Sequence, residues 1–239
     1  MVVTQNGLVV RVFADGADLQ GIAALAANPL IKGFTTNPTL MRQAGVTDYL
    51  EFAREMLGLI GDRPVSLEVF SDEFDEMHRQ ALLLSGLGTN VYVKIPITNT
   101  RSESSASLVS TLTRDGVQVN VTALMTTPQV EATVAALEGG APACISVFAG
   151  RIADTGVDPV PTMIESLKLM ASHPQLELIW ASPRELLNIV QADEIGCHII
   201  TVTHDLLKKL PGLGKDLDEF SLDTVKMFAN DAATAGYQL

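Results

Sequence analysis

The stretch VYVKIPIT, residues 91–98, places a lysine inside a run that otherwise has the pattern of a buried β-strand. Val91, Val93 and Ile95 would share one face of this strand, and Lys94 would lie on the other, because successive side chains point to opposite sides. Burying an unpaired ammonium group is costly. We therefore expect Lys94 to have either a charged partner or a chemical role.

Similar β-branched runs recur along the chain, separated by segments with helical spacing that end at glycines. The runs are VVRVFAD (9–15), GFTTN (33–37), VSLEV (65–69), VYVKIP (91–96), VQVNVT (117–122), ACISVFA (143–149), LELIWAS (176–182) and CHIITVT (197–203). Strand–helix units of roughly 30 residues, repeated in this way, predict an α/β fold of the (β/α)8, or TIM, barrel type. The segment EFSLDTVKMFANDAATAG (219–236) predicts an extra helix at the C-terminal end.

The competing architecture is an open, doubly wound parallel sheet. That fold would carry a glycine-rich phosphate loop after an early strand, and the sequence contains neither G-x-G-x-x-G nor a P-loop. Even spacing of the units favours closure into a barrel. With no linker or low-complexity segment in 239 residues, we expect a single barrel domain over residues 1–239.

The composition excludes several classes of function. A formal net charge of −12 argues against binding to nucleic acid or to an anionic membrane. No signal peptide or membrane span is evident, and Cys144 and Cys197 lie in apolar runs as reduced core cysteines would. We expect a cytoplasmic protein that collects any anionic substrate with a few local cations.

The predicted strands carry polar residues on the face opposite to their valines and isoleucines. These residues are Asp15, Thr35, Asn37, Glu68, Lys94, Asn120, Thr122 and Ser146. They lie towards the carboxyl ends of the strands, where TIM barrels have their active sites. Asp15 and Glu68 are therefore candidate partners for Lys94 in the same space.

Simpler structural explanations exist for each of these residues. A buried lysine–glutamate pair is often only an ion pair, Asn37 followed by Pro38 fits a helix cap, and Arg151 fits a solvated loop. The histidines, which show no metal-ligand spacing, are His78, His173, His198 and His204. We expect no metal and no cofactor. The same polar pattern on six strands nevertheless favours a functional site.

A lysine in an apolar barrel suits one kind of covalent chemistry. Desolvation disfavours the charged form of an amine, and a neutral amine can attack a ketone to give a Schiff base. The iminium accepts electrons when a neighbouring carbon–carbon bond breaks. A carboxylate must move the proton of the leaving hydroxyl, for which Asp15 and Glu68 are the candidates.

The motifs resemble those of the transaldolase family. GFTTNPTL (33–40) resembles the family signature, and VYVKIPIT resembles the segment of the Schiff-base lysine. VNVTAL (119–124), ISVFAGRIAD (145–154) and IWASPRE (179–185) follow in the family's order. The length is similar to that of the small members, which include fructose-6-phosphate aldolases.

This resemblance implies roles for individual residues. Lys94 would form the Schiff base, Asp15 would be the acid–base group, and Glu68 with Thr122 would hold the catalytic water. The substrate-binding residues implied are Thr35, Asn37, Asn120, Ser146 and Phe148, with Arg151, Ser182 and Arg184 at the phosphate.

The resemblance leaves three functions to compare. True transaldolases have a glutamate at the position of Glu68, and the aldolases often have a tyrosine at the position of Phe148. Both residues therefore favour a transaldolase, an enzyme that moves a dihydroxyacetone unit between sugar phosphates. The alternatives are a fructose-6-phosphate aldolase and a non-catalytic sugar-phosphate-binding barrel. Gly16 and Thr224 depart from the family, which often has threonine and an aromatic residue there. We expect a homo-oligomer that acts on sugar phosphates.

Overall fold

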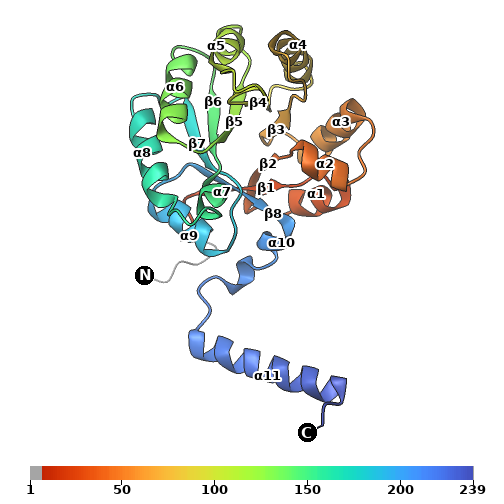
Figure 1. Cartoon of the computed structure of the whole chain (residues 1–239). Helices are drawn as coiled ribbons and strands as arrows, with labels where there is room; N and C mark the ends of the chain where they lie inside the picture. Colours follow the sequence, from red (N-terminus) through yellow and green to blue (C-terminus); the bar gives the residue numbers. More distant parts are fainter. Residues whose placement is uncertain (1–6, 239) are drawn as a thin grey trace.

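Parallel strands close into a barrel, and helices surround it (Figure 1). The computed structural model describes residues 7–238. The strands are β1 (Arg11–Asp15), β2 (Ile31–Thr35), β3 (Val65–Glu68), β4 (Val91–Pro96), β5 (Val119–Leu124), β6 (Ala143–Val147), β7 (Leu176–Trp180) and β8 (Ile199–Thr203). The helices are α1 (Leu19–Ala26), α2 (Pro38–Gln43), α3 (Tyr49–Ile60), α4 (Phe74–Ser85), α5 (Ala106–Arg114), α6 (Thr127–Leu137), α7 (Ala149–Ala153), α8 (Val160–Met170), α9 (Leu187–Glu194), α10 (His204–Leu207) and α11 (Leu217–Ala235). The pairing of β8 with β1 closes the sheet and confirms the predicted TIM barrel with its extra C-terminal helix.

Strand β2 begins and ends two residues earlier than the predicted run at 33–37. Its end is fixed by a helix cap. Asn37 has extended backbone, and its Oδ1 accepts a hydrogen bond from the N–H of Leu40 at 3.0 Å, while Pro38 opens α2. Such a cap satisfies a free N–H group of the first helical turn. The predicted cap is therefore present, and it holds Asn37 just beyond the strand.

The barrel has an apolar core on each side of its sheet. Outward-facing side chains such as Leu67, Val93 and Val121 are fully buried in the larger core cluster. A smaller cluster inside the barrel consists of Phe13, Cys144, Ile179, Ala181 and Ile199. Cys144 and Cys197 are free and buried, as the sequence predicts. Apolar residues fill this part of the barrel interior. The inward polar residues lie nearer the carboxyl ends of the strands, around the cavity there.

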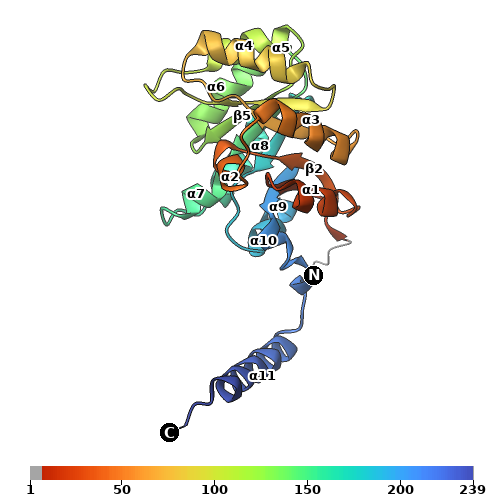
Figure 2. The ribbon, with the colours of Figure 1, turned by 90° about the vertical axis from the view of Figure 1, so that its right-hand side faces the viewer.

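Helix α11 projects away from the barrel in both views (Figures 1 and 2). None of its described side chains is buried. Large apolar side chains on it are exposed, among them Phe220 at 56%, Val225 at 60% and Phe228 at 63%. Thr224 lies on this helix, and none of its residues lines the cavity at the carboxyl ends of the strands. Within residues 7–238, no helix has both the length and the apolar character needed to cross a bilayer.

Candidate active site

A cavity of about 540 Å³ lies at the carboxyl ends of the strands. Ligand sites typically occupy roughly 300–1,000 Å³. Of the residues predicted from the sequence, those lining it are Asp15, Asn37, Glu68, Lys94, Thr122, Ser146, Phe148, Arg151, Ser182 and Arg184. Thr35 and Asn120 lie outside this lining and contact it through hydrogen bonds. The structure therefore brings the predicted residues together in one place.

Lys94 is buried, with 6% of its surface exposed. Its neighbours in the strand register are Glu68 on β3 and Asn120 on β5. The ammonium group donates a hydrogen bond to the carbonyl of Thr36 at 2.8 Å. Among residues 7–238 it forms no ion pair with Asp15 or Glu68, which the sequence suggested as partners. A backbone carbonyl, which the side-chain pattern could not reveal, holds Nζ in the cavity.

Asp15 ends β1 and lies within electrostatic range of this lysine. Its Oδ1 accepts a hydrogen bond from Oγ1 of Thr35 at 2.7 Å, and that hydroxyl also contacts Oγ1 of Thr201 at 2.5 Å. Burial raises the pKa of Asp15, while Lys94, the Thr35 hydroxyl and His204 oppose this shift. Raised carboxyl pKa values are typical of groups that exchange protons near neutral pH.

Glu68 is the last residue of β3. Strands β3 and β5 flank β4, which carries Lys94, so Glu68 and Asn120 lie on opposite sides of the lysine. Burial raises its pKa, Lys94 lowers it, and the charge of Asp15 raises it further. Its backbone carbonyl accepts a hydrogen bond from the Tyr49 hydroxyl at 2.8 Å. In the described part of the chain, no hydrogen bond reaches its carboxylate oxygens. The carboxylate is therefore held in the cavity with its acceptor sites free.

A buried chain of hydrogen bonds connects β3, β5 and β6 beside the lysine. The amide nitrogen of Asn120 donates to Oγ of Ser66 at 2.9 Å, and Oγ of Ser146 donates to the amide oxygen at 2.7 Å. All three residues are buried. The chain fixes the amide and presents Ser146 to the cavity. The inward positions of all three residues follow from strand parity, although Ser66 was not among the site residues expected from the sequence.

The two predicted phosphate-binding arginines differ in their surroundings. Arg184 forms a bidentate pair with Asp154, at 2.9 and 2.5 Å, and donates to Oγ of Ser182 at 2.9 Å. Arg151 forms no ion pair with any described residue, and its guanidinium lies 6.0 Å from the centre of the Phe148 ring. Arg151 is therefore available to an anion, while Arg184 orients the serine.

The loop that carries Ser182 is tightly fitted. Ser182 has φ 61°, in the left-handed region that disfavours side chains. A Cβ added to Gly150 would lie 1.6 Å from the carbonyl oxygen of Ser182, so only glycine allows α7 to approach this loop. Strained backbone of this kind clusters at functional sites.

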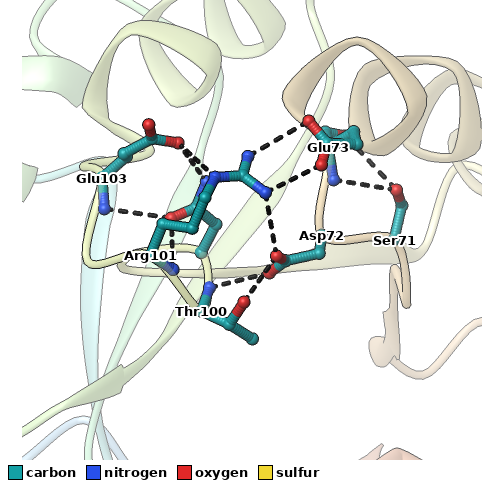
Figure 3. Close-up of polar contacts among 7 residues, drawn as sticks. Ser71, Asp72, Glu73, Thr100, Arg101 and Glu103 are labelled. Carbon is teal, nitrogen blue, oxygen red and sulfur yellow. Dashed lines mark hydrogen bonds and ion pairs between the residues drawn. The ribbon is translucent and has the colours of Figure 1, made fainter.

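An exposed ion-pair network joins the loops that follow β3 and β4 (Figure 3). The guanidinium of Arg101 reaches Glu73 at 2.8 Å, Glu103 at 3.1 Å and Asp72 at 3.3 Å. Thr100 donates its backbone N–H and its hydroxyl to Asp72. Exposed pairs are individually weak, but here they connect the loops that leave the strands of Glu68 and Lys94. Sequence reasoning did not find this network.

The closed barrel and its lysine–carboxylate cavity define a (β/α)8-barrel enzyme. The transaldolase/fructose-6-phosphate aldolase family model matches residues 12–239, and the chain belongs to that family. In the described residues, no three histidine, cysteine or carboxylate side chains gather as metal ligands would.

Individual relatives agree with this assignment. The chain is 35% identical over 218 residues to a probable transaldolase 2 of Listeria monocytogenes, covering 89% of this chain and 95% of that protein. It is 34% identical over 220 residues to a probable transaldolase of Chelativorans sp., covering 90% and 97%. A crystal structure of dihydrodipicolinate synthase from Rhodopseudomonas palustris aligns with a TM-score of 0.60 at 15% identity, over 97% of this chain and 81% of that one, and shows the fold alone.

Proposed function

We propose that the protein is a class I transaldolase of the pentose phosphate pathway. It would convert sedoheptulose 7-phosphate and glyceraldehyde 3-phosphate to erythrose 4-phosphate and fructose 6-phosphate. The observation that carries this proposal is the buried Lys94 in one cavity with Asp15 and Glu68, with Arg151 free of ion pairs among the described residues. The free cysteines fit the reducing cytoplasm, where we place the reaction.

Each group in the cavity has a step to perform in this reaction. The amine of Lys94 attacks the C2 carbonyl of the donor ketose, and loss of water gives the iminium. Asp15 takes the proton of the C4 hydroxyl, the C3–C4 bond breaks, and its electron pair enters the iminium to form an enamine. The aldose phosphate leaves, and the enamine attacks the acceptor aldehyde, which takes its proton back from Asp15. Water held by Glu68 and Thr122 then hydrolyses the new iminium.

A fructose-6-phosphate aldolase is the second candidate, because the same cavity could release free dihydroxyacetone by hydrolysing the enamine intermediate. A non-catalytic sugar-phosphate-binding barrel is the third. One assay separates them: the enzyme is incubated with fructose 6-phosphate, with and without erythrose 4-phosphate, and glyceraldehyde 3-phosphate is measured. We expect sustained product only with the acceptor. Product without acceptor would identify the aldolase, and no product in either case would identify the binding barrel.

Arg151→Ala is expected to raise KM for fructose 6-phosphate by roughly 10- to 150-fold and to leave the use of unphosphorylated donors such as free dihydroxyacetone nearly unchanged. A hydrogen bond to a charged group contributes about 1.5–3 kcal/mol, and the guanidinium has no ion-pair partner in the described residues that would compete with phosphate. Steady-state kinetics with both donors measures the difference. Arg114→Ala, at the end of α5, is the matched control. Equal losses with the two donors would show that Arg151 does not bind phosphate.

We also propose that a second copy of the chain covers α11. The helix leaves the barrel with an apolar face that includes Phe220, Val225 and Phe228, and no described part of the same chain buries it. Large exposed apolar patches mark association surfaces. The double variant Phe220→Glu, Phe228→Glu is expected to lower the mass measured by light scattering to that of one chain. An unchanged mass would place the interface elsewhere.

A further inference from the structure

His204 follows β8 directly and lies beside the end of β1. The barrel closes by pairing these two strands, with Asp15 opposite Thr203 in the register. The imidazole occupies space next to two glycines: a Cβ added to Gly16 would lie 2.7 Å from Nε2, and one added to Gly21 would lie 2.4 Å from Cε1. The ring therefore fills the volume that a side chain at position 16 would otherwise take.

The Nε2 atom of His204 is buried and has no hydrogen-bond partner in the described residues. Buried polar atoms are rarely left in this state, because such an atom loses its hydration without gaining a replacement hydrogen bond. A second cavity of about 450 Å³ lies against the ring, and Asp15, Gly16, Gln43 and Thr203 also line it. Asp15, Gln43 and Thr203 line the active-site cavity as well.

His204 interacts electrostatically with Asp15, and this interaction lowers the pKa of Asp15. Burial raises the pKa of Asp15, and His204 is among the groups that lower it, together with Lys94 and the Thr35 hydroxyl. The other charged groups near the imidazole come from the segments around it. Asp18 accepts a hydrogen bond from the N–H of Gly21, and on the histidine's own helix Asp205 pairs with Lys208 at 2.9 Å. Asp18, Asp205 and Lys208 do not line the cavity that holds Lys94.

We propose that His204 is a positioning residue for the acid–base step: its imidazole packs against Gly16 and holds the carboxyl end of β1, and with it the side chain of Asp15. The inference deepens the proposed function, on which it rests for the role of Asp15 as the base. It also explains Gly16, where the family resemblance led us to expect threonine. A Cβ at position 16 would lie 2.7 Å from Nε2 of His204, so a side chain there would force the imidazole to move.

The first test measures Asp15 directly and needs no turnover. The ¹³C resonance of the Asp15 carboxyl, assigned by its absence from Asp15→Asn, is followed as a function of pH. We expect the midpoint to move to higher pH in His204→Phe, which keeps a ring but removes both nitrogens. His173→Phe, in the loop between α8 and β7, is the matched control and should leave the midpoint unchanged. An unchanged midpoint in His204→Phe would overturn the proposal.

The second test asks whether positions 16 and 204 act together. Gly16→Ala should displace the imidazole and shift the Asp15 midpoint in the same direction as His204→Ala. Combining the two substitutions should then add little to either one, because the shared contact is already lost. Shifts that simply add would show that the glycine and the histidine act independently, against the proposal.

Kinetics supply the third readout. In His204→Phe, the acidic limb of the kcat profile should move to higher pH, with KM for fructose 6-phosphate within about twofold of wild type, because a base with a raised pKa is ionised only at higher pH. Added imidazole should partly restore kcat in His204→Ala. A pH profile identical to wild type would overturn the inference. If the wild-type enzyme shows no transfer at all, the proposed function fails, and the carboxyl titration still decides the role of His204.

Discussion

Lys94→Met is expected to reduce transfer of the dihydroxyacetone unit by more than about 10⁴-fold, the scale on which enzymes lose activity with their covalent nucleophile. The substitution removes the only atom proposed to bond to the donor. Methionine retains an unbranched apolar stem in a position that is 6% exposed, so the fold should be preserved. A melting temperature no lower than that of wild type would confirm that the loss concerns chemistry.

The covalent intermediate itself can be trapped. Borohydride added with fructose 6-phosphate adds hydride to the iminium carbon and leaves a stable secondary amine on the lysine. Trypsin cannot cleave after a modified Lys94, so the adduct should appear on one peptide that extends from Gln80 to Arg101. Lys94→Met should yield no adduct. An adduct mapped to Lys32 or Lys168 would contradict the mechanism.

Two further variants separate nucleophilicity from charge. Lys94→Arg keeps a cation, but a guanidinium stays protonated and cannot act as the amine nucleophile, so this variant should be as inactive as Lys94→Met. Lys168→Met is the matched control, since Lys168 is exposed on α8 and pairs with Glu165 at 3.0 Å. It should retain wild-type rates. Substantial activity in Lys94→Arg would mean that the residue acts only as a positive charge.

The barrel and the inward face of the site could be predicted because both depend on local patterns. A strand has a two-residue period, so one apolar face and one polar face are visible in a single run such as 91–96. Repetition of that pattern in units of similar length predicts closure, and closure brings Asp15, Glu68 and Lys94 to one end. The cap at Asn37 is equally local, since it depends on Asn37 and Pro38 alone.

Contacts between distant segments could not be predicted in this way. Arg184 was expected at the phosphate, yet it pairs with Asp154, which lies 30 positions earlier in the chain. His204 appeared to be an ordinary histidine, and only the pairing of β1 with β8 brings it to Gly16. The one sequence signal for this contact was Gly16, which stands where the family resemblance implied threonine. The direction in which α11 leaves the barrel likewise has no signature in its amphipathic pattern.

Glu68→Gln is expected to change what becomes of the enamine. After cleavage, the enamine on Lys94 either attacks an acceptor aldehyde or takes a proton and is hydrolysed to free dihydroxyacetone. The Glu68 carboxylate has no hydrogen-bond partner in the described residues, so its oxygens can accept from a water shared with Thr122. Glutamine also donates, and would orient that water differently. We expect the ratio of aldolase rate to transfer rate to rise roughly tenfold, measured from glyceraldehyde 3-phosphate with and without erythrose 4-phosphate.

Stability distinguishes this partition from a purely structural role for Glu68. Burial raises the pKa of Glu68, so the folded state binds its proton more tightly than the unfolded state does. That contribution to stability is complete below the unfolded pKa and is lost as pH rises through the folded pKa. The neutral amide avoids this loss, so Glu68→Gln should melt above wild type at pH 8, and the difference should shrink towards pH 4. If the carboxylate merely neutralised Lys94, the variant would melt below wild type at pH 8 and both activities would fall together at an unchanged ratio. An unchanged ratio of aldolase rate to transfer rate would remove Glu68 from control of the partition.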